Sequence, residues 1–218
     1  MQIKHSQLTP RKMGQLITEW IYNTPARVTA RKLHLNYRTA QLWYDRIRKG
    51  ILAQQESLFF EGPVEVDETY LGMKPPGMKG TAMVGKVPVF GIFDRKTGLV
   101  HASVMADVSA SGLLPEILKH VAKGAVIYSD GFGAYYHLRR MEYVHRIVIH
   151  DHYYSLGCGW HSNSIESFWA YLQAHLASRK GLPRYLYNLH VQEVVFRFNN
   201  RDPHKLRYAV RRILTFDA

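Results

Sequence analysis

Hydrophobic and polar residues alternate with the period of an α-helix over the first fifty residues of the chain. Thr9 and Pro10 suit the N-cap and the first position of a helix. The apolar residues that follow have helical spacing: Met13, Leu16, Ile17, Trp20 and Ile21. The segment from Asn23 to Pro25 then predicts the end of this helix, because Asn and Pro favour turns.

A short helix, a tight turn and a longer helix are predicted next. Thr29 can cap a helix over Ala30 to Leu35, and Asn36 can cap another from about Tyr37 to Lys49. The longer helix has an apolar side and a polar side, the latter with Arg38, Gln41 and Asp45. This pattern is typical of a helix-turn-helix DNA-binding unit, although a small helical bundle without a DNA role produces it too.

From residue 63 the pattern changes to the period of two that marks half-buried strands. Strands are predicted over 64–71, 86–94, 99–108, 125–132 and 143–150. Helices are predicted from Ser109 or Ser111 to Val121, and over 133–141, 163–177 and 184–199. The order is three meandering strands, then helix, strand, helix, strand and helices.

Composition narrows the class of protein. The chain has 218 residues, of which 46% are hydrophobic and 21% charged, as in a globular protein. No apolar run approaches the roughly 18 residues of a membrane helix, and no apolar signal core follows Met1. Cys158 is the only cysteine, which excludes an internal disulfide and a zinc ribbon built on CxxC pairs. We therefore expect a protein of a reducing compartment without a membrane partner.

The net charge of +12 is concentrated at the two ends of the chain. Residues 1–61 contain ten Lys or Arg and four acids, and residues 179–212 contain nine and two. Residues 62–178 are neutral, with ten of each. A neutral middle between basic ends predicts a polyanionic partner such as a nucleic acid.

Three acids lie where a solvated surface carboxylate is not expected. Asp67 is inside a strand, Asp130 follows the apolar run 125–128, and Glu166 is in the first turn of an amphipathic helix. Three carboxylates meeting at one point repel unless cations neutralise them, and oxygen ligands favour Mg²⁺ or Mn²⁺. Two such ions about 4 Å apart support attack on a phosphodiester. Together the acids predict a nuclease or strand-transfer enzyme, whereas each alone fits a structural role.

Five phrases carry a resemblance to a known family. Within about residues 62–205 they are, in order, EVDETYLG, KVPVFGIFDR, YSDGFGAY, HSNSIESFW and VVFRFNNR. They resemble the bacterial insertion-sequence transposases of the ISXO type, and the order of elements resembles the ribonuclease-H-like (RNase H-like) core of the retroviral-integrase superfamily. The resemblance implies an α/β fold. Its core is a mixed five-stranded sheet flanked by helices, preceded by a small all-α helix-turn-helix domain.

The same resemblance implies an activity. Asp67, Asp130 and Glu166 would be the three acids of a DDE site, the last two being 36 residues apart as is typical of such enzymes. The family cuts the ends of a transposon with water and joins the freed 3′-hydroxyl to target DNA. The implied cofactors are two Mg²⁺ (or Mn²⁺) ions. The implied partners are transposon terminal repeats and target DNA, bound by a homodimer or a higher multimer.

Three features depart from the family pattern. Many relatives have an N-terminal zinc ribbon, which this chain cannot form, so no zinc is expected. Lys or Arg often follows the third acid by two helical turns, where this chain has Gln173. Some members use Asn as the third catalytic residue, which makes Asn163 the alternative third ligand. Glu166 is favoured because a carboxylate neutralises Mg²⁺ better than an amide does.

Further residues are candidates for supporting roles. His161 would contact a phosphate or orient the site, and Trp160 and Trp169 fit its wall or the core. Glu68 should point to the opposite face of the strand from Asp67. The candidates for DNA contact are Arg38, Gln41, Arg46, Lys49, Arg197, Asn200 and Arg201. A zinc site built from His150, His152, Cys158 and His161 is disfavoured, because the spacing fits no standard pattern.

The expected organisation follows from these assignments. A helix-turn-helix domain is predicted over 1–58, a catalytic domain over 62–205 and a basic tail over 206–218. A bacterial transposase of this kind would be cytoplasmic and associated with the nucleoid. Two alternatives remain: a decayed or repurposed transposase that acts as a DNA-binding regulator, and a hydrolytic nuclease with the same core.

Overall fold

The computed structural model describes residues 7–54, 58–72, 86–148, 163–177, 179 and 181–216. Its first elements are helices: α1 (Pro10–Ile21), α2 (Ala26–Lys32) and α3 (Tyr37–Ala53). The predicted caps of two of them are confirmed. Thr9 accepts the backbone N–H of Lys12 at the start of α1, and Asn36 accepts that of Arg38 at the start of α3.

The start predicted for α2 is wrong. The helix begins four residues before Ala30, directly after Pro25, whose fixed φ suits a helix entry. Thr29 is a buried residue inside the helix instead of its cap, and its hydroxyl lies 2.8 Å from the hydroxyl of Tyr44 on α3. This bond ties the two helices together across the turn at residues 33–36.

The middle of the chain forms one five-stranded sheet with the order β3-β2-β1-β4-β5. Its strands are β1 (Val64–Leu71), β2 (Val87–Asp94), β3 (Val100–Val104), β4 (Val126–Ser129) and β5 (Val144–Ile147). β2 runs antiparallel to both β1 and β3, whereas β4 runs parallel to both β1 and β5. The mixed five-stranded sheet flanked by helices is therefore confirmed.

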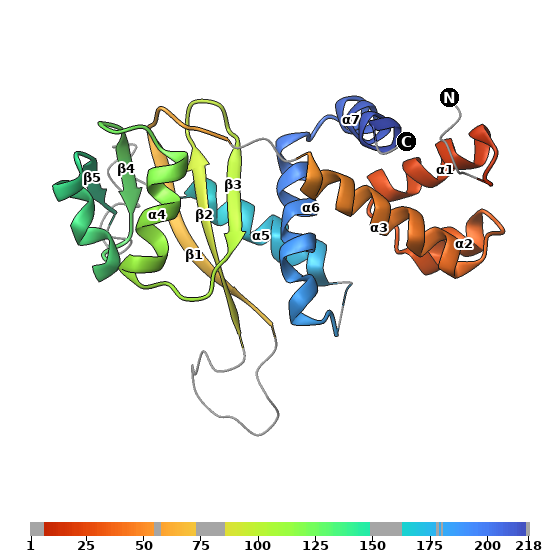
Figure 1. Ribbon diagram of the computed structural model, residues 1–218, viewed down its shortest axis with the longest axis horizontal. Coiled ribbons are helices and arrows are strands. Elements are labelled where there is room, and N and C mark those ends of the chain that lie inside the picture. Colours follow the sequence, from red (N-terminus) through yellow and green to blue (C-terminus); the bar gives the residue numbers. More distant parts are fainter. Residues whose placement is uncertain are drawn as a thin grey trace, which may run out of the picture.

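Helices cover both faces of this sheet (Figure 1). On one face lie α4 (Ala110–His120) and the 3₁₀ helix η1 (Gly133–Met141), packed against apolar residues such as Val64, Val66 and Ile127. On the other face, α5 (Asn163–Ala177) and α6 (Tyr187–Asn199) pack against residues such as Val89, Phe93 and Ala102. A short 3₁₀ turn, η2 (Arg184–Leu186), precedes α6.

The last helix, α7 (Pro203–Phe216), returns to the N-terminal helices at the right of Figure 1. Its apolar side joins the core of α1 and α3 through Leu206, Val210, Ile213 and Leu214. The segment expected as a basic tail is thus a helix up to residue 216. It is amphipathic, and its apolar residues recur at the spacing that one helix face requires.

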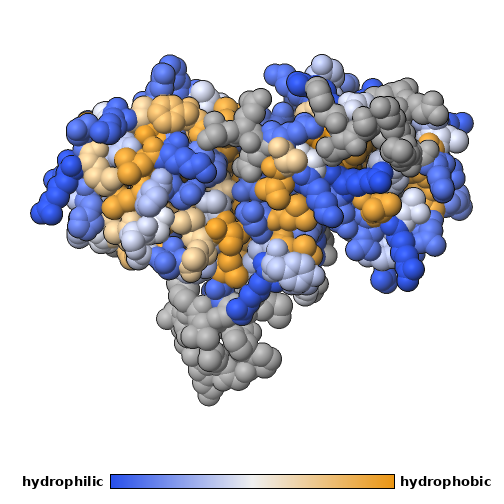
Figure 2. Space-filling view, in the orientation of Figure 1, coloured by the Kyte–Doolittle hydropathy of each residue, from blue (hydrophilic) through white to orange (hydrophobic). Residues whose placement is uncertain are grey.

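The surface of the molecule mixes hydrophilic and hydrophobic residues. Figure 2 shows hydrophilic residues with hydrophobic patches between them over the described parts of this face. Among the helices that the structure describes, none is both long and apolar enough to cross a membrane.

Candidate active site

Asp67 lies in the middle of β1, on the face of the sheet that α5 covers. Side chains of a strand alternate between the two faces, so Glu65 and Asp67 share one face. Two hydrogen bonds from α5 confirm this placement. The backbone N–H of Ile165 donates to Glu65 Oε2 over 3.0 Å, and the indole N–H of Trp169 donates to Asp67 Oδ2 over 2.9 Å.

Trp169 reaches Asp67 because the neighbouring strand has no side chain in its way. Gly91 on β2 is the residue paired with Asp67. A Cβ atom at Gly91 would lie 2.6 Å from the ring atom Cη2 of Trp169, closer than real Cβ contacts come. Trp169 is buried, so it belongs both to the core and to the wall of this site, as its sequence position indicated.

Asp130 follows β4 directly, next to β1. Glu65 pairs with Tyr128 across the two parallel strands. Two residues further along each strand, Asp67 and Asp130 therefore lie side by side, at the point where β4 ends. Asp130 is exposed, and its Oδ1 accepts the backbone N–H of Phe132 over 3.0 Å. This short turn fixes the carboxylate at the end of its strand.

Glu166 approaches from the helix on the same face. It is exposed in the first turn of α5 and lies three residues before Trp169, a spacing that puts both side chains on one side of the helix. The three acids thus come from a strand centre, a strand end and a helix start.

Burial and the two neighbouring acids both act on the pKa of Asp67. Burial raises the pKa of Asp67, and the hydrogen bond from Trp169 lowers it again. The charges of Asp130 and Glu166 both raise it further, and the net pKa stays above the usual value. A carboxylate shifted in this direction by like charges gains stability from any cation bound beside it.

Glu65 is a part of this region that the sequence did not reveal. It is fully buried, and its Oε1 accepts the Nε–H of Arg95 over 2.8 Å. The guanidinium of Arg95 also lies 3.8 Å from the ring centroid of Tyr128 on β4. Together with the bond from Ile165, Glu65 therefore links β1, β4 and the first turn of α5, the elements that carry the three acids. A carboxylate inside a strand, two residues before Asp67, was the available signal.

Glu68 points to the opposite face of the sheet from Asp67, as predicted. It accepts a hydrogen bond from the hydroxyl of Tyr135, a residue of η1. Burial raises the pKa of Glu68 to about 7, and the charges of Asp67 and Asp130 act in the same direction. The charges of Asp67 and Asp130 therefore reach Glu68, but its hydrogen-bond partner Tyr135 lies in the helical layer on the opposite face of the sheet.

Several candidates lie wholly or partly outside the described residues. Asn163 is the first residue of α5, but its side chain is outside the described part, so the choice between it and Glu166 stays a prediction. Gln173 is exposed on α5 and lines a cleft together with Arg179 and Arg184. The residues that fall entirely outside are His150, His152, Cys158, Trp160 and His161.

Four of the candidates for DNA contact share one exposed helix face. Arg38, Gln41, Arg46 and Lys49 are all exposed on α3, at intervals of three to five residues. Their spacing keeps them on the side opposite to the buried Trp43 and Ile47. The turn before α3 contains His34 in the left-handed conformation, with φ of 50°. These residues form a polar surface on a helix that follows a tight turn.

The expected DNA contact by Arg197 is wrong. Arg197 is only 2% exposed, and its guanidinium donates to the backbone carbonyls of Trp20 and Ile21 and to the carboxylate of Glu193. Of its predicted neighbours, Asn200 is half-buried and donates to the carbonyl of Phe196, whereas Arg201 is exposed. Arg197 ends on the buried side of α6 because α1 packs there.

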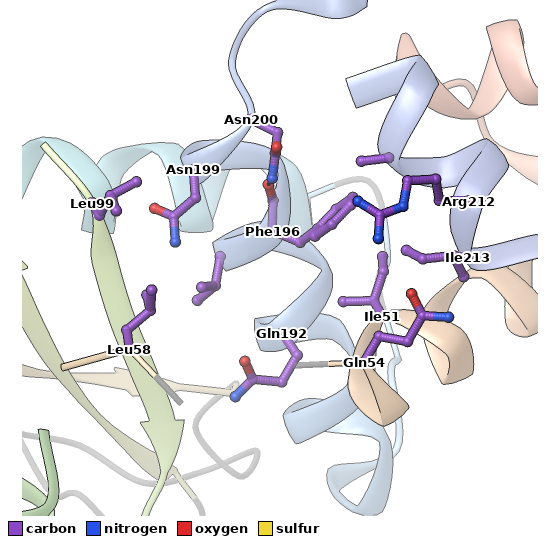
Figure 3. A pocket seen from close by; sticks show the side chains of 12 residues that line it. Ile51, Gln54, Leu58, Leu99, Gln192, Phe196, Asn199, Asn200, Arg212 and Ile213 are labelled. Carbon is purple, nitrogen blue, oxygen red and sulfur yellow. Dashed lines mark hydrogen bonds between the residues drawn. The ribbon is translucent and has the colours of Figure 1, made fainter. Parts of the chain in front are cut away.

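A cleft of about 400 Å³ lies away from the acids, at the junction of α3, α6 and α7 (Figure 3). Its walls are mixed, with apolar residues such as Phe196 and Ile213 beside amides. Two of the amides already bond to β3. Gln192 donates to the carbonyl of Ala102, and Asn199 pairs with the backbone of Val100. The cleft is therefore part of the junction between the two halves, and the three acids do not line it.

Comparison with known families agrees with this architecture. The model of the ISXO2-like transposase domain matches residues 59–199, well over half of the chain. The chain belongs to this family. The match spans all five strands together with α5 and α6, so it includes Asp67, Asp130 and Glu166.

Two relatives point the same way. An uncharacterized transposase-like protein of Haemophilus influenzae is 29% identical over 103 residues, which cover 47% of this chain and 83% of that protein. An uncharacterized protein in the transposable element ISH50 of Halobacterium salinarum is 25% identical over 217 residues, which cover 89% of this chain and 73% of the relative. The family and these relatives support a transposase.

Retroviral integrases are among the solved structures that match. One is the HTLV-2 integrase catalytic core domain in complex with magnesium, with a TM-score of 0.41 and 14% identity over 65% of this chain and 87% of that chain. Another is from the intasome of simian T-cell lymphotropic virus in complex with the PP2A regulatory subunit B56 gamma. Its TM-score is 0.42, with 16% identity over 66% and 50% of the two chains. The RNase H-like fold class rests on the sheet itself, with its three antiparallel strands followed by two parallel ones.

Proposed function

We propose that this protein is a DNA transposase that cuts the ends of a mobile element and joins the freed 3′-hydroxyl to target DNA. Asp67, Asp130 and Glu166 hold two Mg²⁺ or Mn²⁺ ions in this proposal. The observation that carries it is the placement of the three acids: Asp67 on β1 is bonded to Trp169 of α5, Asp130 directly follows the neighbouring parallel strand, and Glu166 lies one turn before Trp169. The matched range of the transposase family contains all three acids, which supports the proposal.

The residues present suit a hard divalent cation. All three side chains offer carboxylate oxygens, which Mg²⁺ and Mn²⁺ prefer over nitrogen or sulfur. When bound, a pair of such ions would activate the attacking oxygen and stabilise the leaving oxygen of a phosphodiester. A cation also removes the repulsion among the acids, which is the unfavourable feature of the site without it.

The chain's own residues orient the ligands. Trp169 donates a hydrogen bond to Oδ2 of Asp67 and so restrains the plane of its carboxylate. The other oxygen, Oδ1, is then held in a defined direction for a metal ion. Glu65 holds the first turn of α5, and with it Glu166, against β1. The bond from Phe132 limits the rotation of Asp130. Ligands restrained in this way lose little conformational freedom when metal and DNA bind, which favours catalysis.

We further propose that the helical half binds DNA. In this assignment α2 and α3 act as a helix-turn-helix, and Arg38, Gln41, Arg46 and Lys49 face the DNA. Arg and Gln read base edges, while Lys adds contacts to phosphates. Arg201 supplies a further phosphate contact beside the catalytic half. Work on both element ends and target DNA requires at least a dimer of this chain on DNA.

The test is a cleavage and joining assay with the terminal DNA of the element. Wild type is compared with Asp130→Asn, and Mg²⁺ with EDTA. Glu61→Gln is the matched control, because Glu61 is an exposed carboxylate outside the site. We expect joined product with wild type and with the control in Mg²⁺, a loss of at least 100-fold with Asp130→Asn, and no product in EDTA.

Other outcomes would replace the proposal. Metal-dependent cleavage that never uses a 3′-hydroxyl end as nucleophile would identify a hydrolytic nuclease. Tight DNA binding without cleavage by wild type would identify a DNA-binding regulator. Full activity of Asp130→Asn would remove Asp130 from the site. Glu166→Gln and Asn163→Ala in the same assay assign the third ligand.

A further inference from the structure

A second group of metal-ligating side chains lies on the other face of the sheet from Asp67. His101 is on β3, an edge strand, while Glu116 and His120 are one turn apart on α4, the helix in front of the sheet in Figure 1. One ligating atom from each of the three residues lies within 4.8 Å of those of the other two. The group therefore bridges a strand and the helix packed on it.

The distances within the group resemble those around a small metal ion. Oε2 of Glu116 lies 3.5 Å from Nε2 of His101 and 3.7 Å from Nε2 of His120. Two ligands at about 2.0–2.2 Å from a tetrahedral Zn²⁺ are roughly 3.3–3.6 Å apart. Both separations between carboxylate and imidazole are thus near the value that zinc requires, but they are long for a good hydrogen bond.

Both imidazoles have a buried nitrogen without a hydrogen bond in the described part of the chain. His101 is 7% exposed and His120 is 2% exposed, and Nε2 of each lacks a hydrogen-bond partner among the described residues. An unpaired buried polar atom is costly and rare in native proteins. Here two unpaired imidazole nitrogens lie beside one carboxylate. A metal ion would accept the lone pairs of both nitrogens at once.

The other nitrogen of His120 has the partner expected of a metal-bound histidine. Nδ1 lies 2.7 Å from the backbone carbonyl of Leu58, so it donates its proton there and Nε2 carries the lone pair. Zinc-bound histidines usually donate their second N–H to a carbonyl or carboxylate in this way. For His101, Nε2 is the ring nitrogen that faces Oε2 of Glu116.

We propose that His101, Glu116 and His120 bind one zinc ion, separate from the metal ions of the proposed active site. Two imidazole nitrogens and one carboxylate favour Zn²⁺ over Mg²⁺, which prefers oxygen ligands and keeps its water. Glu116 is partly exposed, with 26% of its side chain accessible, so the ion and a water molecule as fourth ligand can enter from solvent.

The ion would fasten α4 to the edge of the sheet. The two rings now stack, with centroids 3.7 Å apart and planes 25° apart. Metal binding would draw both lone pairs toward one point, so the stack would open slightly. Since Asp67 lies on the opposite face, the zinc ion has a structural role and does not take part in phosphodiester chemistry.

The test combines metal binding with thermal unfolding of the full-length protein. Protein stripped with a chelator is titrated with Zn²⁺, and with Co²⁺, whose visible absorption reports tetrahedral nitrogen and oxygen ligands. We expect one Zn²⁺ per chain and a rise in Tm of about 5–10 °C at a hundred times Kd. The Asp130→Asn protein should still bind one Zn²⁺ and show the rise in Tm, because Asp130 belongs to the proposed active site.

The variants are chosen to keep the protein folded. Glu116→Gln is conservative at a partly exposed position, and His120→Gln keeps a polar side chain of similar reach. Both should weaken zinc binding at least tenfold and reduce the shift in Tm. His137→Gln, an exposed histidine on η1, is the matched control and should change neither.

Two results would overturn the zinc site. One is wild-type protein that shows no rise in Tm and no tetrahedral Co²⁺ spectrum. The other is Glu116→Gln and His120→Gln proteins that are folded and bind zinc as tightly as wild type. Neither result bears on DNA cleavage, which is measured separately with Mg²⁺.

Discussion

Two carboxylates in this protein, one buried and one partly buried, have surroundings of opposite charge. Glu193 on α6 is fully buried among arginines, and Asp67 on β1 lies beside other carboxylates. Burial alone would raise the pKa of Glu193, but the charges of Arg48, Arg197 and Arg179 and a hydrogen bond from His190 hold it well below its usual value. For Asp67, burial raises the pKa and the charges of Asp130 and Glu166 act in the same direction.

The contacts of Glu193 explain what it does. Its carboxylate lies 2.6 Å from Nε of Arg48 on α3, 2.9 Å from Nη2 of Arg197 and 3.1 Å from Nη2 of Arg179. Arg197 continues to backbone carbonyls at the end of α1 and lies 3.5 Å from the ring centroid of Trp20. This ion cluster joins α1 and α3 to α6, and so joins the N-terminal helices to the part of the fold that contains the sheet.

The difference separates a structural carboxylate from a proposed metal ligand. Protein cations neutralise Glu193 within the fold, so its interactions are complete. The charges that act on Asp67 leave a net excess of negative charge, which a cation from solvent would neutralise. Three predictions test this contrast.

The largest effect is expected from Glu193→Gln. The substitution removes the carboxylate that Arg48, Arg179 and Arg197 share, although Arg48 keeps its pair with Asp45. Breaking a buried ion cluster in this way costs about 3–5 kcal/mol. Urea unfolding measures the loss. The control is Glu19→Gln, whose partly exposed pair with Lys32 is worth at most about 1 kcal/mol. A loss below that of the control would show that the junction does not depend on Glu193.

Asp67→Asn should act in the opposite direction. In EDTA the amide removes one of three repelling charges, so we expect the free energy of unfolding to rise by roughly 1 kcal/mol, while activity in Mg²⁺ is lost. Added Mg²⁺ should then stabilise wild type but not the variant. The contrast would fail if Asp67→Asn destabilised the metal-free protein as Glu193→Gln does.

The smallest effect concerns pH and His190. Burial, with the charges of Arg48 and Arg179, lowers the pKa of His190 in the folded protein. The unfolded chain therefore binds the proton first as pH falls below about 6.5, and the folded state loses stability from there down to its own lower pKa.

His190→Gln removes this proton linkage. Between pH 7.5 and pH 5.5, wild type should lose about 1 kcal/mol of unfolding free energy relative to the variant. Thermal or urea unfolding at both pH values measures the difference. His204→Gln, an exposed histidine on α7, serves as the control. A difference that stays constant with pH would contradict the shift assigned to His190.

Local patterns were sufficient for most elements. The five strands and the caps Thr9 and Asn36 depend on residues close in sequence, and they were predictable. The start of α2 was not, because Thr29 found its partner in Tyr44 on another helix. The third strand is also shorter than expected, ending at Val104.

The three acids could likewise be identified from the sequence, as carboxylates in an apolar strand, at a strand end and in a helix start. The residues that contact them could not be predicted. Trp169 reaches Asp67 only because α5 crosses Gly91, and Glu65 bonds to Ile165, a residue one hundred positions away. Such contacts depend on how helix and sheet pack, which no local pattern encodes.

The sequence by itself determined the order of helices and strands up to α6, the family and the candidate acids, because these follow from periodicity and from short phrases. Only the tertiary structure decided which charges are neutralised. It buried Arg197 beside Glu193 instead of leaving it for DNA, and it brought His101 of β3 to Glu116 and His120 of α4. Charge and ligand pairing depend on distances between residues far apart in the chain, and packing alone sets those distances.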